Sequence, residues 1–379
     1  LAEQTLRNAL DASPRDTALQ LELAQLLIRE RRTQDAADLL ENSAKAAPTD
    51  AAIQEALART YLVEPDFPKA LAACDALQRI APRSAVGFFL AGIAYEGDHK
   101  VPEALHAYAS ALEREPNAFE PLAALARLEA AHGQLPKAIA IVTDATARVP
   151  SSAPVVNLLG ELYLIQKDPV RATQAFKSAI VLAPSYAPAY RNVALAQITE
   201  HDLAGAIDSY QHAIAADPAQ PRYAIELAQV YVRDNRVDDA IASYERWHEK
   251  NPGVQVITNN LADMLVTYRT DRASLDLARG LTASLAGSQD GHFLDTVGWV
   301  RYKRAEYAQA LPALQQAVAL DPGIPELRYH LAMAELHTGE SAQARSDLQQ
   351  ALSTTPTANW TRDARAALAS LDGSGQLAR

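Results

Sequence analysis

The sequence predicts an all-α solenoid, in which a pair of antiparallel helices is repeated along the chain. A proline recurs every 34 residues from Pro14 to Pro252, and Pro322 and Pro356 resume the interval after a gap of 70 residues. Between the prolines, small and apolar residues recur at spacings of three, four and seven, which are the spacings of helices. Glycine is sparse, with 15 residues, and the abundance of Ala, Leu, Glu, Gln and Arg favours helix.

Composition and charge narrow the class of protein. The chain has 379 residues, of which 49% are apolar and 21% charged, and this balance is that of an ordered protein. It exceeds the roughly 250–300 residues at which a single core stops growing, as expected if the core extends in one dimension. The net charge of −11 argues against non-specific nucleic-acid binding, because phosphates require a basic surface. No apolar run reaches the roughly 20 residues of a transmembrane segment.

One period illustrates how each helix pair is built. Residues 153–184 read APVVNLLGELYLIQKDPVRATQAFKSAIVLAP. The first predicted helix carries a small residue, Gly160, and ends at the polar turn QKDP. The second carries Ala172 and Phe176, and Pro184 ends it because proline lacks a backbone donor and clashes with the preceding turn. The small residues let the two helices approach closely, and the larger ones fill the space between pairs.

The same slots recur in the other periods. The slot of Gly160 is always small: Ala24, Ala58, Gly92, Ala126, Ala194, Ala228, Ala262, Gly298 and Ala332. The slot of Phe176 holds Leu40, Cys74, Tyr108, Val142, Tyr210, Tyr244, Leu314 and Leu348. Cys74 is the single cysteine and can form no internal disulfide, and its slot predicts a buried structural thiol.

The periods predict the order of elements along the chain. We expect one continuous solenoid over residues 1–358, in which residues 1–16 are the second helix of an incomplete repeat and ten full repeats follow. Residues 359–371 read as a terminal capping helix, with Trp360 covering the last repeat, and residues 372–379 as a frayed tail. Because the chain begins in the middle of a repeat, we expect Leu1 to be a boundary inside a longer protein.

One repeat departs from the pattern. Residues 255–290 form a unit of 36 residues, with an unusual turn, YRTDR, and an unusual ending, AGSQDG. Its small slot is ambiguous between Ala273 and Ser274. Just before it, Trp247 fills a slot that is alanine in other repeats. Two such departures side by side mark either a functional or strained site or a simple change of superhelical pitch.

The recurring order of a small residue, Tyr, Ala, Phe, Ala and Pro within 34 residues resembles the tetratricopeptide repeat (TPR) family. The resemblance covers nearly the whole chain. It implies a right-handed superhelix whose first helices line a concave groove. It also implies that the chain is a scaffold that binds a protein or an extended peptide in that groove.

A second resemblance concerns the C-terminal repeats. The segments NNLADML (259–265), FLDTVGWV (293–300) and PELRYHLAMA (325–334) resemble bacterial TPR proteins of the PEP-CTERM/exosortase exopolysaccharide system, of the PrsT type. This resemblance implies a periplasmic lipoprotein anchored in the outer membrane, with a role in exopolysaccharide biosynthesis or export. A cytoplasmic location is the alternative.

No catalytic constellation is found, and we expect no enzyme activity, no cofactor and no metal. The histidines form no HExxH motif, and Walker, dinucleotide-binding and Gly-x-Ser-x-Gly loops are missing from the sequence. His330 and His337 lie seven residues apart on one predicted helix, with Glu335 between them. That arrangement fits either a metal site or, more simply, solvated histidines.

The TPR resemblance implies which side chains face the groove, because certain slots of each first helix lie next to the small residue and point inward. The candidate partner-binding residues are Arg127, Asn157, Arg191, Asn192, Arg222, Asn259, Asn260, Asp263, Trp299, Tyr302, Tyr329 and His330. Trp299, Tyr302, Tyr329 and Asn260 are the preferred contacts, because aromatic anchors contribute much of the binding energy in many interfaces. The alternatives are that the charged side chains are simply solvated and that the aromatic ones pack on the neighbouring repeat.

Other functions remain open. Some TPR proteins clamp the C-terminal carboxylate of a peptide with Lys and Asn on successive first helices. That pattern is missing here, because Arg222 is followed by Glu226 where a second cation is required. Polysaccharide binding through aromatic rings and asparagines is a competing function, although aromatic residues make up only 6% of the chain. A regulatory arm of a larger enzyme is another.

Overall fold

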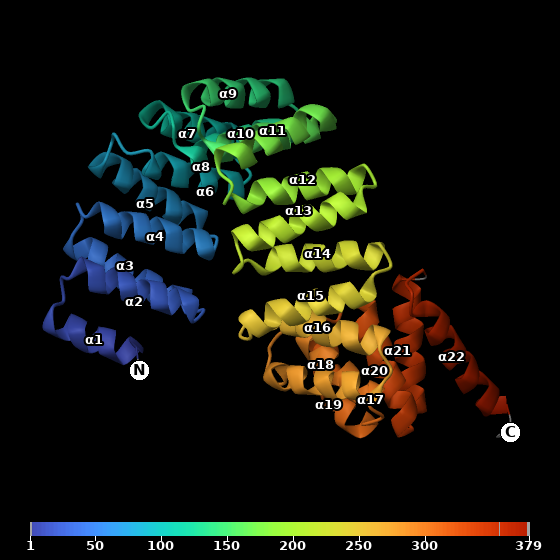
Figure 1. Ribbon diagram of the computed structural model, residues 1–379. Coiled ribbons are helices and arrows are strands. Elements are labelled where there is room, and N and C mark those ends of the chain that lie inside the picture. The colour runs from blue at the N-terminus through green and yellow to red at the C-terminus, as the bar shows by residue number, and fades with distance from the viewer. Residues whose placement is uncertain (1, 356, 377–379) are drawn as a thin grey trace. The chain divides into compact units, whose positions relative to one another are not determined.

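The computed structural model describes residues 2–355 and 357–376, and within them the chain is all-α, with one short 3-10 helix and no strand (Figure 1). It divides between Ala196 and Gln197 into two compact units, which we call unit 1 and unit 2. The predicted all-α solenoid of helix pairs is confirmed within each unit. That residues 1–358 form one continuous solenoid stays a prediction.

Unit 1 holds the first half of the helix pairs. Its helices are α1 (Ala2–Ala12), α2 (Thr17–Arg29), α3 (Thr33–Ala46), α4 (Ala51–Val63), α5 (Phe67–Ile80), α6 (Val86–Gly97), α7 (Val101–Arg114), α8 (Phe119–Ala131), α9 (Leu135–Arg148), α10 (Ala153–Ile165), α11 (Pro169–Leu182) and α12 (Ala187–Thr199), and the unit boundary falls within α12. Even-numbered helices are the first helices of their repeats. Odd-numbered helices are the second.

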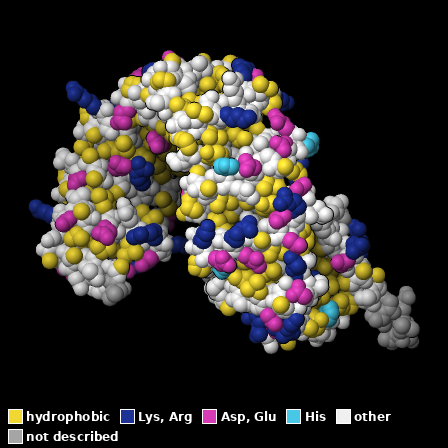
Figure 2. Space-filling model, in the orientation of Figure 1, with side chains coloured by type: hydrophobic (Ala, Val, Ile, Leu, Met, Phe, Trp, Pro, Cys, Tyr) yellow, Lys and Arg dark blue, Asp and Glu magenta, His cyan; other side chains and the backbone are white. Residues whose placement is uncertain are grey.

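Unit 2 holds the rest. Its helices are α13 (Leu203–Ala216), α14 (Pro221–Arg233), α15 (Val237–Lys250), α16 (Gln255–Tyr268), α17 (Arg272–Thr282), the 3-10 helix η1 (Ala283–Leu285), α18 (Gly291–Lys303), α19 (Tyr307–Leu320), α20 (Pro325–Thr338), α21 (Ser341–Thr354) and α22 (Thr361–Gln376). On the face drawn in Figure 2, basic and acidic side chains are interspersed rather than gathered into a patch of one sign.

The recurring prolines stand just beyond the second helices. α3 ends at Ala46, two residues before Pro48, and α13 ends at Ala216, two residues before Pro218. The same offset holds for the other prolines of the series in the described chain. Pro356 itself lies outside the described residues. The proline therefore follows each helix end at a position where its missing N–H costs no helical hydrogen bond.

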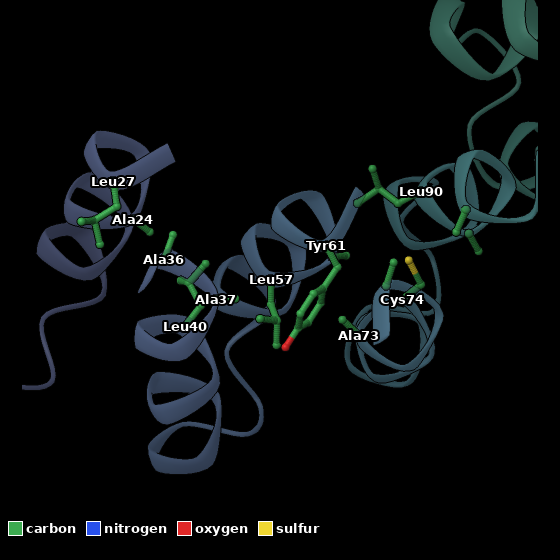
Figure 3. Close-up of a cluster of buried hydrophobic side chains, with 14 of the residues drawn as sticks. Ala24, Leu27, Ala36, Ala37, Leu40, Leu57, Tyr61, Ala73, Cys74 and Leu90 are labelled. Carbon is green, nitrogen blue, oxygen red and sulfur yellow. The ribbon is translucent and has the colours of Figure 1, made fainter. Parts of the chain in front are cut away.

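The small slots face the large residues of the second helix, as predicted. Phe176 is fully buried, and a Cβ on Gly160 would lie 2.5 Å from its ring, so only glycine fits this approach. In unit 1 the alternation of small and large side chains forms a continuous apolar cluster that includes Ala24, Leu40 and Cys74 (Figure 3). Burial raises the pKa of the Cys74 thiol to about 12, which confirms an inert structural cysteine.

The turns inside most repeats share one backbone feature. The residue in the middle of the turn has a positive φ, and it is glycine at Gly133 and Gly339. At the matching turns it is a residue with a side chain: Arg31, His99, Lys167, His201, Asn235 and Ala305. A left-handed conformation is costly for residues with a Cβ, so these tight turns are held by the packing of the two helices that they join.

The irregular repeat closes differently. α17 is shorter than the second helices of the other full repeats and is followed by η1, and its buried residues are Leu275, Ala278 and Thr282. Ala273 and Ser274, the two candidates for the small slot, are both outside this buried set. Arg304, whose side chain is buried, pairs with Asp276 of α17 and with Glu306, and so ties the short helix to the next repeat.

The C-terminal helix is longer than predicted. α22 runs from Thr361 to Gln376, so helix continues into the segment 372–379 that we expected to be frayed, and residues 377–379 lie outside the described chain. Trp360, just before α22, stacks on Tyr329 of α20 with ring centroids 5.1 Å apart. It thus covers the last full repeat, as the sequence suggested.

Candidate partner-binding surfaces

A hydrogen-bonded network joins three first helices of unit 1. The amide nitrogen Nδ2 of Asn192 on α12 donates to Oδ1 of Asn157 on α10 over 3.0 Å. Nδ2 of Asn157 donates to Oε1 of Glu161 over 3.0 Å, and the other oxygen of Glu161 pairs with the guanidinium of Arg127 on α8 at 2.9 Å. The sequence had placed these side chains on successive first helices, and the structure joins them. We call this set the asparagine network.

An aromatic cluster occupies the first helices of unit 2. Trp299 on α18 stacks on Tyr302 with centroids 4.5 Å apart and on the His330 ring of α20 at 3.9 Å. The ammonium of Lys303 lies 4.9 Å from the Trp299 ring centroid, a cation–π distance. A second stack, of Tyr307 and His337, adjoins Tyr302.

His330 is also held by a carboxylate. Its Nδ1 lies 2.8 Å from Oδ2 and 3.0 Å from Oδ1 of Asp295 on α18. Burial alone lowers the pKa of His330. The carboxylates of Asp295, Glu326 and Asp263 outweigh burial, so the net shift of this pKa is upward. The protonated imidazolium is therefore favoured inside the fold, between an aromatic ring and a carboxylate. We call Trp299, Asp295 and His330 the histidine cluster.

Asp263 on α16 borders the histidine cluster and is open to solvent, although protein surrounds its carboxylate on the remaining sides. That surrounding protein withholds water and raises the pKa of Asp263 to about 6, and the carboxylates of Glu326 and Asp295 raise it further against the opposing attraction of His330. Four residues earlier on α16, Oδ1 of Asn259 is buried without a hydrogen-bond partner in the described structure. The carboxylate of Asp263 is therefore the acceptor that this stretch of α16 presents to solvent, whereas Oδ1 of Asn259 is inaccessible.

Profiles of the tetratricopeptide repeat match the chain in both units. One matches residues 1–59, 97–162 and 197–256, and a second, also described as a tetratricopeptide repeat, matches residues 298–359, so that together they span well over half of the sequence. The chain belongs to the tetratricopeptide repeat family. No curated protein matches the sequence.

Several solved structures resemble this TPR chain in their arrangement of helices. Yeast Tom70 is 15% identical, with a TM-score of 0.46 over 99% of this chain and 92% of that one. The human IFIT1 dimer with PPP-AAAA is 15% identical, with a TM-score of 0.46 over 80% of this chain and 72% of that one. The APC/C hetero-tetramer Cut9–Hcn1 is 16% identical, with a TM-score of 0.39. This chain spans only 58% of the matched chain in that assembly, while 97% of its own length is covered.

The TPR structure sorts the predicted groove residues by exposure. The buried ones are Asn157, Asn192, Trp299, Tyr329 and His330; the half-buried ones are Arg191, Asn259, Asn260 and Tyr302; the exposed ones are Arg127, Arg222 and Asp263. Trp299 is only 7% exposed and Tyr329 5%, so these two rings pack between repeats instead of presenting a face to a partner. The expectation that Trp299 lies open in the groove is therefore corrected.

Two further candidates are engaged by other side chains, one within its own helix and one on the preceding repeat. Arg222 pairs with Glu226 one turn later on α14 at 3.0 Å. Nδ2 of Asn260 donates to the hydroxyl of Tyr244 over 3.5 Å, at the limit of a hydrogen bond. Both contacts are weak enough that a group of the binding partner could replace them at an accessible surface.

Sequence reasoning missed one unusual group, Glu335. It is 4% exposed, its Oε2 has no partner in the described structure, and burial with the nearby carboxylates of Asp347 and Glu340 raises its pKa to about 7. The corresponding residue is tyrosine in other repeats, for example Tyr231. The glutamate at this position could therefore have been noticed from the sequence. Glutamate is usually exposed in proteins, so a glutamate at this buried position is unusual.

Metal binding has no geometric support in the described chain. Across residues 2–355 and 357–376, no three His, Cys, Asp or Glu side chains are grouped so as to hold an ion. Nδ1 of His330 faces Asp295, and Nδ1 of His337 lies 2.9 Å from the carbonyl oxygen of Met333. None of the helices described is both long enough and apolar enough to cross a membrane.

Proposed function

We propose that this TPR chain is a non-catalytic scaffold that binds a protein or an extended peptide along the first helices of unit 2. TPR folds are typical of protein–protein interaction, and their helix pairs are generally non-catalytic scaffolds. The carrying observation is the solvent-open carboxylate of Asp263, four residues after Asn259 on α16. We call the surface of α16, α18 and α20 around these two residues the acceptor face.

The chemistry of the acceptor face selects the partner. Asp263 and Glu326 both expose carboxylates, so the face offers acceptors and negative charge. Lys and Arg side chains supply donors and positive charge, and such hydrogen bonds are the stronger ones. The stacked ring of Trp299 behind the face holds it rigid, so little order is lost on binding. A basic segment in an extended conformation is the expected partner.

Peptide titration tests this proposal. Fluorescent peptides of equal length, basic, neutral or acidic, are titrated by anisotropy, and the basic peptide should bind most tightly. Asp263→Asn should weaken that peptide by about three- to tenfold, and binding should strengthen as the pH rises through about 6, because the carboxylate then ionises.

A matched control separates the acceptor face from general charge effects. Glu249 is exposed on the second helix α15, and Glu249→Gln removes the same charge from another face. It should leave peptide affinity unchanged. Equal affinity for the acidic peptide, or an Asp263→Asn variant that binds as the parent does, would contradict the proposal.

A finer proposal concerns the biological setting. The segments 259–265, 293–300 and 325–334 resemble TPR proteins of bacterial exopolysaccharide systems, and on that resemblance we propose a periplasmic partner in polysaccharide biosynthesis or export. Deleting the gene in its source organism and measuring exported polysaccharide tests this. Unchanged export would contradict this proposal about the biological setting. It would not bear on peptide binding by the acceptor face.

Direct polysaccharide binding has less support. Sugar rings pack on exposed aromatic faces, and here the rings of Trp299, Tyr329 and Trp360 are stacked on other rings. A protein partner therefore fits the acceptor face better than a glycan.

A further inference from the structure

A cavity lies between the second helices α13 and α15 of unit 2, away from the acceptor face. Its volume is about 550 Å³, within the range of small-molecule sites. Apolar side chains form most of its wall, with a few polar groups among them. The lining residues are Gln211, Ile214, Ala215, Pro218, Leu227, Ser243, Arg246, Trp247 and Lys250.

Trp247 makes this cavity different from those between other second helices. Its slot is alanine in six other full repeats, at Ala111, Ala145, Ala179, Ala213, Ala317 and Ala351. The ring is 4% exposed, and its Nε1 donor has no hydrogen-bond partner in the described structure. An unpaired buried donor is costly, which marks Trp247 as an unusual residue for this slot.

Two cations flank the tryptophan on α15. Arg246 precedes it by one residue and Lys250 follows it by three, and both line the cavity and are exposed. No ion pair is recorded for either in the described structure. By contrast, Arg236 at the start of the same helix pairs with Asp239 at 2.7 Å. The mouth of the cavity thus carries two uncompensated positive charges.

Unit 1 provides an internal comparison. A cavity of about 760 Å³ lies along α11, two repeats earlier, and three of its lining residues, Pro150, Ser178 and Leu182, match Pro218, Arg246 and Lys250 of the unit 2 cavity. The residue that matches Trp247 there is Ala179. The indole with two cations is therefore not repeated at the matching positions of this unit 1 cavity.

We propose that the cavity of unit 2 binds a small apolar carboxylate. Its hydrocarbon body packs against Trp247, Ile214 and Leu227, where burial removes apolar surface from water. Its carboxylate accepts hydrogen bonds from the cationic groups at the mouth. An apolar body with one terminal anion matches both features of the site, an apolar wall and a basic mouth.

The indole N–H resonance of Trp247 reports binding directly. The chain has three tryptophans, and the ¹⁵N–¹H indole signal that disappears in Trp247→Ala belongs to Trp247. Titration with decanoate should shift this signal saturably, with a dissociation constant of about 1 mM or tighter. The signals of Trp299 and Trp360 should not move.

Charge and shape are tested separately. Decyltrimethylammonium has the same chain length and the opposite charge, and it should bind at least about tenfold more weakly than decanoate. The double variant Arg246→Ser, Lys250→Leu installs the residues of the unit 1 cavity, and it should also weaken decanoate at least about tenfold. Because Lys250→Leu adds apolar surface, purely hydrophobic binding would instead become tighter.

Three outcomes would overturn the proposal. They are a Trp247 signal that decanoate does not shift saturably, equal binding of decyltrimethylammonium, and undiminished decanoate binding by the double variant. Circular dichroism of the double variant checks that its helices are intact, since both replaced side chains are exposed.

Discussion

Units 1 and 2 fill the same three slots of successive first helices with different chemistry. In unit 1, Asn157 stands three residues before the small residue Gly160, Glu161 follows it directly, and Asn192 stands two residues before the next small residue, Ala194. In unit 2, Asp295, Trp299 and His330 occupy those positions around Gly298 and Ala332. The asparagine network and the histidine cluster therefore occupy the same three positions of the repeat, one set in each unit.

The shared geometry shows what the backbone decides and what the side chains decide. The pair formed across successive first helices is 3.0 Å apart for Asn192 and Asn157 and 2.8 Å apart for His330 and Asp295. The helix pairs thus bring these two slots into hydrogen-bond contact both for a pair of amides and for a carboxylate with an imidazole. The amides of unit 1 do not titrate, whereas the imidazole and carboxylates of unit 2 do. The residues in the slots therefore set how each unit responds to pH.

The largest expected difference between the two sites is in stability. It concerns the residue directly after the small residue, which is Trp299 in unit 2 and Glu161 in unit 1. Trp299→Ala should lower the stability of unit 2 by about 3–5 kcal/mol, because the ring is 7% exposed and stacked on Tyr302 and His330. Hydrogen exchange read separately for peptides of α18 and α20 measures this loss, since long repeat arrays need not unfold in one step.

The matched change in unit 1 is Glu161→Ala. Glu161 is partly exposed, so its loss should cost about 1 kcal/mol through the weakened contacts of Asn157 and Arg127. Exchange that accelerates no more in Trp299→Ala than in Glu161→Ala would show that the ring is an open contact after all.

The next difference is the response to pH. The folded-state pKa of His330 lies above its unfolded value, so its stabilisation is complete below about pH 6.5 and is lost as the pH rises through the folded value. The raised pKa values of Asp263, about 6, and Glu335, about 7, act in the same direction, because ionising these carboxyls costs stability. Unit 2 should therefore lose about 1–3 kcal/mol between pH 5.5 and pH 8.5.

Restoring the unit 1 residue at one slot isolates the contribution of the imidazole. His330→Asn places in unit 2 the residue that Asn192 provides in unit 1, and it should flatten the pH dependence measured on α18 and α20. The comparison uses exchange rates corrected for the intrinsic effect of pH. A slope that His330→Asn leaves unaltered would assign the dependence to the carboxyls alone.

Much of the fold follows from the repeat spacing. The prolines located the ends of the second helices, and the small slots located the contact between the helices of each pair, as Gly160 and Phe176 show. Both signals are local, because they depend on residues within one period. The first-helix slots also placed Asn157 and Asn192 on helices that do meet.

Exposure could not be predicted in the same way. Trp299 is buried because His330, 31 residues later, supplies a ring at 3.9 Å, and the pattern of one repeat does not reveal that neighbour. The period also did not predict that α17 ends early or that α22 continues to Gln376, into the segment expected to be frayed. For Trp299, a contact distant in sequence determines its burial.

A third comparison concerns the slot three residues after the small residue of the first helix, which is tyrosine in four repeats. Glu129 in unit 1 and Glu335 in unit 2 both occupy it and are both buried, but only Glu129 has a cation, the ammonium of Lys137 at 2.6 Å. Glu335→Gln should stabilise unit 2 by about 2 kcal/mol more at pH 8.5 than at pH 5.5, because the folded-state carboxyl loses its proton between these pH values while the unfolded one is ionised at both. Thermal unfolding at the two pH values measures both.

Adding the missing cation gives an independent check of that comparison. Gln343 stands where Lys137 does, one residue before the small slot of the second helix. Gln343→Lys should stabilise the protein at pH 8.5, whereas Glu129→Gln in unit 1 should destabilise it by removing a paired carboxylate. A destabilising Glu335→Gln would mean that its carboxylate has a partner in solution.

The smallest difference lies in the turns between paired helices. Gly133 in unit 1 and Ala305 in unit 2 hold the same left-handed position, at φ of 80° and 62°. Ala305→Gly should stabilise unit 2 by about 0.5–1 kcal/mol because it removes the steric cost of a Cβ at positive φ, while Gly133→Ala should cost unit 1 about 1 kcal/mol. No atom outside the turn lies within 4 Å of a Cβ on Gly133, so its effect comes from the backbone alone. Urea unfolding, followed by hydrogen exchange in peptides of α18–α19 and of α8–α9, compares the two turns. The two substitutions should change stability in opposite directions. A destabilising Ala305→Gly would contradict this prediction. It would show that the added freedom of the unfolded chain and the lost contacts of the Ala305 methyl group together outweigh the relief of strain.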